Sequence, residues 1–145
     1  MAIRQLNPYL NFGGNAAQAI AFYEKALGAK AETVQKFGDV PSMPAAAENK
    51  DRVMHALLKV GAGTIMISDG PPGMPIPSDS NVHVTLDFDD AKEMEQRFDA
   101  LGAGGTITMP MQDTFWGARF GMLKDKFNVS WMFNSDKQMG SKIGT

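Results

Sequence analysis

The stretch Pro8-Tyr9-Leu10-Asn11-Phe12, followed by Ala26-Leu27-Gly28-Ala29, occurs in similar form a second time in this chain. Val82-His83-Val84-Thr85-Leu86 takes the place of the first segment, and the identical Ala100-Leu101-Gly102-Ala103 takes the place of the second. The interval from residue 8 to residue 82 equals that from residue 26 to residue 100, so both segments recur at one constant offset. Solenoid repeats have shorter periods, roughly 20–50 residues. We therefore expect two similar modules that share one fold.

Each copy has the pattern of one strand, one helix and three further strands. In the first copy a β-prone run, 6–12, precedes a helical face that ends at Gly28. In the second, the strand 81–88 precedes a helix with Asp89 or Asp90 as its N-cap, and Gly102 is expected to stop this helix. The later strands are expected at 30–37, 52–60 and 64–68, and at 105–109, 117–124 and 129–134. This pattern predicts an α+β fold of two βαβββ modules in tandem, whose curved mixed sheets surround a cavity.

The length of the chain is that of a single domain. Its 145 residues are enough to bury a full core without metals or disulfides. We expect one domain over 1–145, with module one at 3–69, a proline-rich link at 70–80, module two at 81–135 and a tail at 136–145. The loop 38–51 is interpreted either as an arm over the cavity or as a surface loop.

The overall charge and the absence of cysteine exclude several classes of function. Lys and Arg total 14 against 16 Asp and Glu, so the net charge of −2 disfavours nucleic acid and anionic membranes as partners. The chain has no cysteine, which excludes disulfides and thiolate sites and agrees with a reducing compartment. No apolar run is long enough to cross a bilayer. We expect a soluble, cytoplasmic protein.

Three segments carry a resemblance to a known superfamily. The run Ala-Phe-Tyr-Glu-Lys-Ala-Leu-Gly at 21–28 and the closing segments 113–117 and 125–131 resemble the vicinal oxygen chelate superfamily, which includes glyoxalase I, extradiol dioxygenases, and fosfomycin and bleomycin resistance proteins. Within it, 8–10, 65–69 and 114–116 look most like the PhnB-like branch, often described as 3-demethylubiquinone-9 3-methyltransferase-like. The resemblance covers about residues 3 to 135 and implies the same paired modules and a homodimer.

The resemblance also implies where a metal would bind. Metal enzymes of the superfamily use one ligand from the first strand and one from the last strand of each module. Those positions fall on Tyr9 and His83, and on Met66 and Met132. Only His83 is a usual ligand, whereas a divalent ion needs at least three nitrogen or oxygen donors. We therefore expect no metal site and no cofactor; the alternative is a divalent ion at a displaced site near His83.

Alternation along the strands brings both histidines to the cavity face. Residues two apart share a face, so His83 and Thr85 lie opposite the helix-packed side, as does His55. Each histidine is interpreted either as a general base or as a hydrogen-bonded or solvent-exposed wall residue.

Other residues are candidates for binding a ligand. Tyr9, Met66, Thr85 and Met132 lie along the inward-facing strands, and the methionines are either an adaptable wall or core filler. Arg119 is expected to meet an anionic group or to be a plain surface charge. Phe115 and Trp116 either close a pocket mouth or anchor a loop or a dimer contact.

Three functions are consistent with these patterns. The first is a protein that binds a small molecule in its cavity without the standard metal site. The second is a glyoxalase- or dioxygenase-like enzyme, with a metal near His83 or with metal-free acid–base catalysis by His55 and His83. The third is a degenerate duplicate retained for an interaction. The methyltransferase description requires a nucleotide-binding turn that the sequence lacks.

Overall fold

A computed structural model gives the fold of residues 3–39, 49–70, 72–73, 75–76 and 80–136. The chain divides into two compact units, Met1–Pro77 and Ser78–Thr145, and each is described by itself. Most of the loop predicted at 38–51 and nearly all of the tail predicted at 136–145 lie outside the described residues. No helix in the described ranges is long and apolar enough to span a membrane.

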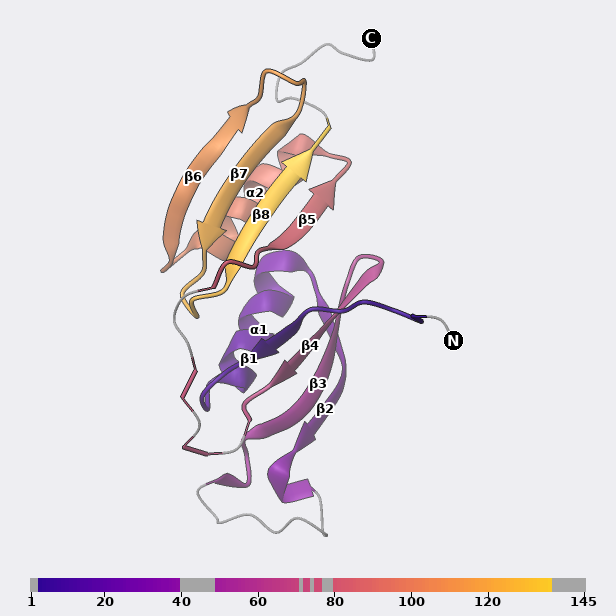
Figure 1. Cartoon of the computed structure of the whole chain (residues 1–145), viewed down its shortest axis with the longest axis vertical. Helices are drawn as coiled ribbons and strands as arrows, with labels where there is room; N and C mark the ends of the chain where they lie inside the picture. The colour runs from indigo at the N-terminus through magenta and orange to yellow at the C-terminus, as the bar shows by residue number, and fades with distance from the viewer. Residues whose placement is uncertain (1–2, 40–48, 71, 74, 77–79, 137–145) are drawn as a thin grey trace. The chain divides into compact units, whose positions relative to one another are not determined.

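The first unit is a four-stranded mixed sheet with one helix (Figure 1). Its elements are β1 (Tyr9–Asn11), α1 (Ala16–Leu27), β2 (Lys30–Lys36), the 3-10 turn η1 (Phe37–Asp39), β3 (Val53–Val60) and β4 (Gly63–Ser68). The strand order is β1-β4-β3-β2. The first strand runs parallel to β4, and the other neighbours are antiparallel.

The second unit repeats this topology. Its elements are β5 (Val84–Phe88), α2 (Ala91–Gly102), β6 (Thr106–Asp113), β7 (Arg119–Lys124) and β8 (Ser130–Ser135). The strand order is β5-β8-β7-β6, again with one parallel pair, β5 with β8. The predicted α+β fold of two βαβββ modules is thereby confirmed.

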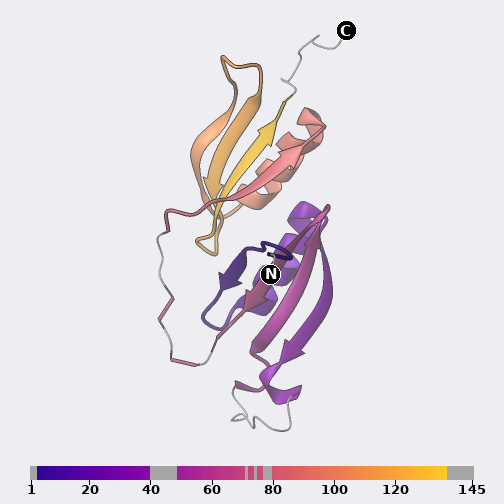
Figure 2. The same ribbon diagram turned by 45° about the vertical axis from the view of Figure 1, so that its right-hand side comes forward.

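One helix covers one face of each sheet (Figures 1 and 2). The first helix buries Ala16, Ala19, Ile20, Tyr23 and Ala26, and the strands bury Leu58, Ile65 and Ile67. In the second unit Trp131 and Phe133 are fully buried, and the Phe98 ring of α2 meets the Phe133 ring edge-on, 5.1 Å between centroids. Alternate residues of each strand thus supply the core.

The strand register corrects the predicted constant offset between the two modules. Tyr9 is the partner of Met66, and Thr85 is the partner of Met132. If the two methionines are equivalent, as the sequence predicts, the residue equivalent to Tyr9 is Thr85 and not His83. The two predicted pairs, Tyr9 with His83 and Met66 with Met132, therefore do not both hold in register, because Met132 lies opposite Thr85.

The helix ends also differ between the two modules. Gly28 ends α1 in the left-handed conformation at φ 69°, as predicted. Gly102, predicted to stop the second helix, is instead the last residue of α2, and Ala103 is its C-cap. The repeated Ala-Leu-Gly-Ala motif therefore occupies different positions at the two helix ends. Of the two predicted N-caps, Asp89 and Asp90, it is Asp90 that caps α2, because its carboxylate accepts from the backbone N–H groups of Lys92 and Glu93.

Candidate functional site

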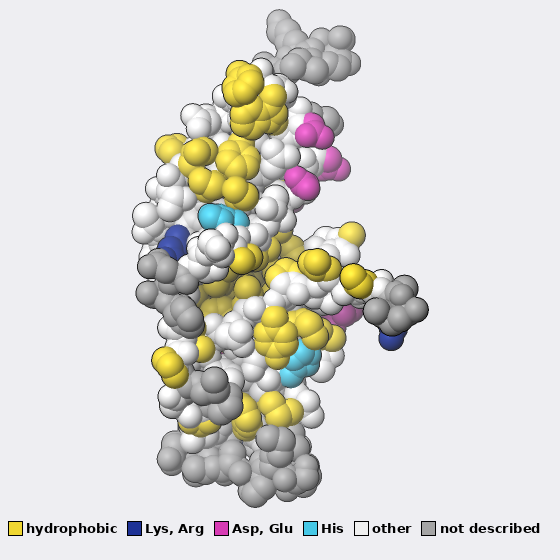
Figure 3. Space-filling model, viewed as in Figure 1, with side chains coloured by type: hydrophobic (Ala, Val, Ile, Leu, Met, Phe, Trp, Pro, Cys, Tyr) yellow, Lys and Arg dark blue, Asp and Glu magenta, His cyan; other side chains and the backbone are white. Residues whose placement is uncertain are grey.

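The face of each sheet opposite its helix is called the open face below. On the first sheet it carries Tyr9, Asn11, His55, Leu57, Lys59 and Met66, none of which is fully buried. On the second sheet it carries Thr85, Asp87, Phe120, Met122, Lys124 and Met132, which are also partly or fully exposed. Figure 3 shows hydrophobic side chains and one histidine at the surface of each unit. These two open faces carry both polar and apolar side chains that are at least partly exposed.

Tyr9 and His55 form a hydrogen-bonded pair on the open face of the first sheet. The Tyr9 hydroxyl lies 3.3 Å from His55 Nδ1, and the ring centroids are 5.9 Å apart. Tyr9 lies on β1 and His55 on β3, so β4 separates them and Met66 is the register partner of Tyr9. When Tyr9 donates its proton to Nδ1, the neutral imidazole carries its own proton on Nε2. In this state His55 offers its Nε2–H as a donor, on the same sheet face as the Met66 thioether.

The equivalent positions of the second sheet lack this pair. Gln35 is the partner of His55, and Gln112 is the partner of Phe120, which places Phe120 at the position of His55. Thr85 takes the place of Tyr9, as its pairing with Met132 shows. The hydroxyl–imidazole pair is therefore a property of the first unit alone.

Several open-face positions nevertheless carry the same residue in both sheets. They are Met66 and Met132 beside the opening strands, Lys59 and Lys124 beside Thr64 and Ser130, and Gln35 and Gln112 on the outer strands. The similarity of the two modules extends to residues that do not form the core.

The positions implied for metal ligands are described one unit at a time. In the first sheet, the Tyr9 phenol of the opening strand lies opposite the Met66 thioether of the closing strand. In the second sheet, the Thr85 hydroxyl lies opposite the Met132 thioether. Within the described ranges, no group of three or more His, Cys, Asp or Glu side chains is arranged to hold an ion. A borderline or hard divalent ion needs such donors.

His83 is half-buried and lies one residue before β5. It has no hydrogen-bond partner among the residues that the structure describes. His55 and His83 belong to different units, so the contacts of each are given separately. Of the two candidate bases, only His55 is held by another polar side chain within the described part of the chain.

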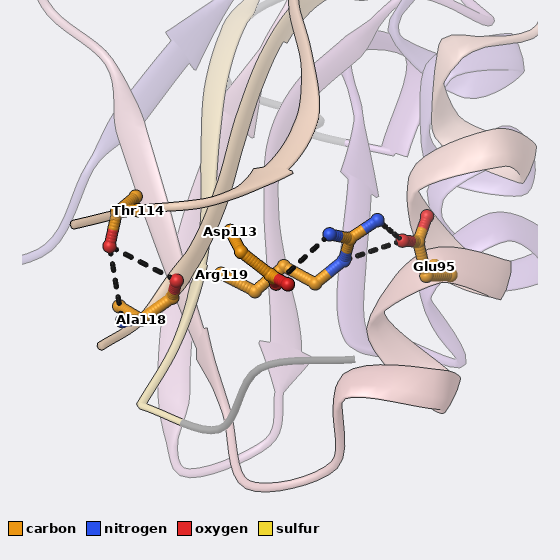
Figure 4. A network of polar contacts seen from close by, with 5 residues as sticks. All are labelled: Glu95, Asp113, Thr114, Ala118 and Arg119. Carbon is orange, nitrogen blue, oxygen red and sulfur yellow. Dashed lines mark hydrogen bonds and ion pairs between the residues drawn. The ribbon is translucent and has the colours of Figure 1, made fainter. Parts of the chain in front are cut away.

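Arg119 has partners within its own unit (Figure 4). Its Nε donates to Glu95 Oε1 at 2.7 Å, Nη2 contacts the same oxygen, and Nη1 donates to Asp113 Oδ1 at 3.1 Å. Burial disfavours the charge, but the hydrogen bonds to Glu95 and Asp113 raise the pKa of Arg119 above its ordinary value. Because Glu95 is on α2, the guanidinium ties the sheet to the helix and lies on the face opposite Met132.

Phe115 and Trp116 are exposed at the turn between β6 and β7. Phe115 is 97% exposed and Trp116 61%, and their rings meet edge-on with 4.9 Å between centroids. The turn is closed by the Thr114 hydroxyl, which donates to the Ala118 carbonyl and accepts from the Ala118 N–H, both at 3.0 Å (Figure 4). The structure thus places the two rings at the surface of an ordered turn.

Two buried carboxylates bond to backbone and indole N–H groups. Asp69 Oδ1 accepts from the N–H groups of Gly14 and Ala16, both at 2.9 Å, at the start of α1. Asp69 caps the start of α1, since the N-cap residue Asn15 makes no side-chain cap of its own. In the second unit Asp125 Oδ2 accepts from Trp131 Nε1 at 2.9 Å.

The sequence suggested neither the pairing of Tyr9 with His55 nor the long-range bonds of Asp69. The parallel β1–β4 register places Tyr9 opposite Met66. The β3–β4 register places Leu57 opposite the same Met66, and His55 is the neighbour of Leu57 on the same face of β3. A correct register would have been the signal that brings the two rings together.

The chain is similar to a family model, to a protein of known sequence and to a solved structure. The family model described as the Glyoxalase/Bleomycin resistance protein/Dioxygenase superfamily matches residues 5–133. Protein YjdN of Escherichia coli is 39% identical over 142 residues, covering 92% of this chain and 96% of that protein. The crystal structure of PA1353 from Pseudomonas aeruginosa is 40% identical with a TM-score of 0.83, covering 94% of this chain and 100% of that one.

A more distant structure shares the fold. It is described as a putative 3-demethylubiquinone-9 3-methyltransferase, PhnB protein, from Bacillus cereus. It is 21% identical with a TM-score of 0.71, and the match covers 91% of this chain and 99% of that one.

Proposed function

The chain belongs to the Glyoxalase/Bleomycin resistance protein/Dioxygenase superfamily, and we propose that it binds a small organic molecule at the Tyr9–His55 pair, without a divalent metal. The observation that supports this most is the 3.3 Å contact between the Tyr9 hydroxyl and His55 Nδ1 on an open sheet face. Both side chains remain accessible, since Tyr9 is 46% exposed and His55 is half-buried.

The chemistry of this face indicates the kind of ligand. His55 presents an N–H donor when Tyr9 donates to it, and Met66 and Leu57 supply apolar surface between the two rings. A ligand oxygen is suited to the imidazole N–H, and an apolar or aromatic body is suited to the thioether. We propose an organic molecule with an oxygen acceptor and an apolar ring or chain.

A second candidate function is metal-free acid–base catalysis by His55. Tyr9 is well placed to fix the orientation and tautomer of the imidazole, which a general base requires. The two candidates differ in one measurable result. Binding alone leaves the ligand unchanged after prolonged incubation, whereas catalysis converts it.

We further propose that the chain is of the PhnB-like branch, which the fold of the Bacillus cereus protein supports. We also propose that the protein is cytoplasmic and that it forms a homodimer. Light scattering tests the dimer, because a monomer gives 15.7 kDa and a dimer twice that mass.

The binding proposal is tested by a thermal-shift screen of aromatic carboxylates and phenols, with EDTA present throughout. Ligands that stabilise the protein are tested again on Tyr9→Phe and His55→Asn. Matched controls are Thr85→Val and Phe120→Leu, at the equivalent positions of the second sheet. We expect weaker binding in the first pair and unchanged binding in the controls. A screen in EDTA that finds no stabilising ligand, or equal losses in all four variants, contradicts the proposal.

A further inference from the structure

The open face of the first sheet carries two lysines directly opposite each other. Lys30 of β2 is the register partner of Lys59 of β3, and Lys59 is in turn the partner of Thr64 of β4. Lys30 is exposed and Lys59 is half-buried. Leu58, the neighbour of Lys59 along β3, is fully buried in the core. Because side chains alternate along a strand, the two lysines lie on the face that also carries His55.

No carboxylate balances the charges of these two lysines in the part of the chain that the structure describes. No ion pair joins either lysine to an acidic side chain there, not even to Glu32, the extra residue of the β-bulge beside them. The Lys59 ammonium contacts the Thr64 hydroxyl at 3.4 Å. Like charges directly opposite each other on neighbouring strands destabilise a sheet. An anion held by both ammonium groups would remove this repulsion.

The lysine pair shares its sheet face with the Tyr9–His55 pair, and apolar side chains lie between the two pairs. His55 and Lys59 are both on β3, and four residues of a strand span about 13 Å. Leu57 lies midway between them and is opposite Met66. The face therefore presents an imidazole, then a leucine and a thioether, and then two ammonium groups.

We propose that Lys59 and Lys30 bind the carboxylate of an elongated organic acid whose other end carries an oxygen that accepts from His55. This inference rests on the proposed function and names the class of its ligand, an acid such as a hydroxyaryl carboxylate. A lysine has three N–H donors, so Lys59 keeps two beside its contact with Thr64. Hydrogen bonds between an ammonium and a carboxylate are stronger than neutral ones.

The second sheet provides an internal control. Lys124 stands at the position equivalent to Lys59, as the partner of Ser130. Its partner on the outer strand is Thr106, where the first sheet has Lys30. The second sheet therefore lacks the lysine pair, and Lys124→Met is the matched control for Lys59→Met.

The test is isothermal titration calorimetry of the full chain in EDTA with para-hydroxycinnamate, its methyl ester and cinnamate. The ester lacks the negative charge, and cinnamate lacks the hydroxyl oxygen. We expect para-hydroxycinnamate to bind at least about fivefold more tightly than its ester, the effect of one partly exposed ion pair. It should also bind more tightly than cinnamate. Added salt should weaken binding of the acid and leave binding of the ester unchanged.

Variants show which residues cause the preference for the acid. Lys59→Met should abolish it, because methionine is unbranched and uncharged. Lys59→Arg should retain it, Lys30→Met should reduce it, and Lys124→Met should leave it unchanged. Far-UV circular dichroism checks that each variant keeps the fold.

Two results overturn this inference and leave the proposed function standing. The first is equal binding of the acid and the ester, or no binding of the acid, while other ligands from the screen still require Tyr9 and His55. The second is an equal loss of the acid preference in Lys59→Met and Lys124→Met, which indicates attraction to any surface lysine. If Tyr9→Phe and His55→Asn change the affinity for no ligand, the proposed function fails and this inference fails with it.

Discussion

Replacing Asp69 by Asn should destabilise the first unit while leaving ligand binding intact. The Asp69 side chain is 2% exposed and accepts three backbone hydrogen bonds. Oδ1 accepts from Gly14 and Ala16, and Oδ2 accepts from Val53 at 2.8 Å. The carboxylate thus joins the start of α1 to β3, and it does so away from the Tyr9–His55 pair.

The size of the effect follows from the donors that lose their acceptor. An asparagine side chain has one oxygen, so its NH₂ group must face at least one of the three backbone N–H groups. If the oxygen takes the place of Oδ1, it keeps the bonds to Gly14 and Ala16, and only the Val53 N–H loses its acceptor. A buried donor left without a partner costs about 1–3 kcal/mol, and neutral acceptors are weaker than charged ones. We expect Asp69→Asn to lower the free energy of unfolding by about 2–4 kcal/mol. Asp69→Ala should lower it further, because all three donors lose their acceptor.

Urea unfolding followed by far-UV circular dichroism and tyrosine absorbance measures this change. Both tyrosines lie in the first unit and both tryptophans in the second, so tyrosine absorbance and tryptophan fluorescence report different units. Asp51→Asn is the matched control, since Asp51 is exposed and should change stability by less than about 0.5 kcal/mol. If Asp69→Asn changes stability as little as this control does, the capping role assigned to Asp69 is refuted.

Further predictions concern the second unit. Asp125→Asn should turn an amide N–H toward Trp131 Nε1, lowering stability by about 1–3 kcal/mol and changing tryptophan fluorescence; an unchanged urea midpoint contradicts this. Arg119→Lys should cost about 1 kcal/mol without affecting ligand affinity, because a compact ammonium lacks the planar fork of donors that joins Glu95 to Asp113; weaker binding in this variant contradicts its structural role. Phe115→Ser should leave the urea midpoint unchanged, since the ring is 97% exposed.

The sequence was sufficient to predict the fold because its local signals agree. The left-handed glycine at 28 and the N-cap at Asp90 mark helix ends through their own backbone and side-chain chemistry. Gly102 marks the end of α2 to within one residue, since it is the last helical residue and Ala103 is the C-cap.

The candidate site was less predictable because it depends on strand register. A constant offset equates Tyr9 with His83, but the hydrogen-bonded ladder equates Tyr9 with Thr85. Register is set by pairing between strands distant in sequence, as is the contact between Tyr9 and His55 across β4. The bonds of Asp69 depend on tertiary structure in the same way, since Gly14 and Ala16 are distant from it in the sequence.

Histidine NMR tests the proposed binding site most directly. The chain has two histidines, so a ¹⁵N-histidine spectrum contains the Nδ1 and Nε2 signals of two imidazole rings, and His55→Asn assigns each set to its residue. The spectrum is recorded in EDTA with a stabilising carboxylate or phenol from the screen, for the wild type and for Tyr9→Phe. We predict that the ligand shifts the His55 signal in EDTA and that Tyr9→Phe weakens this response. A His55 signal that does not move, or a response that EDTA abolishes, would contradict metal-independent binding at the Tyr9–His55 pair.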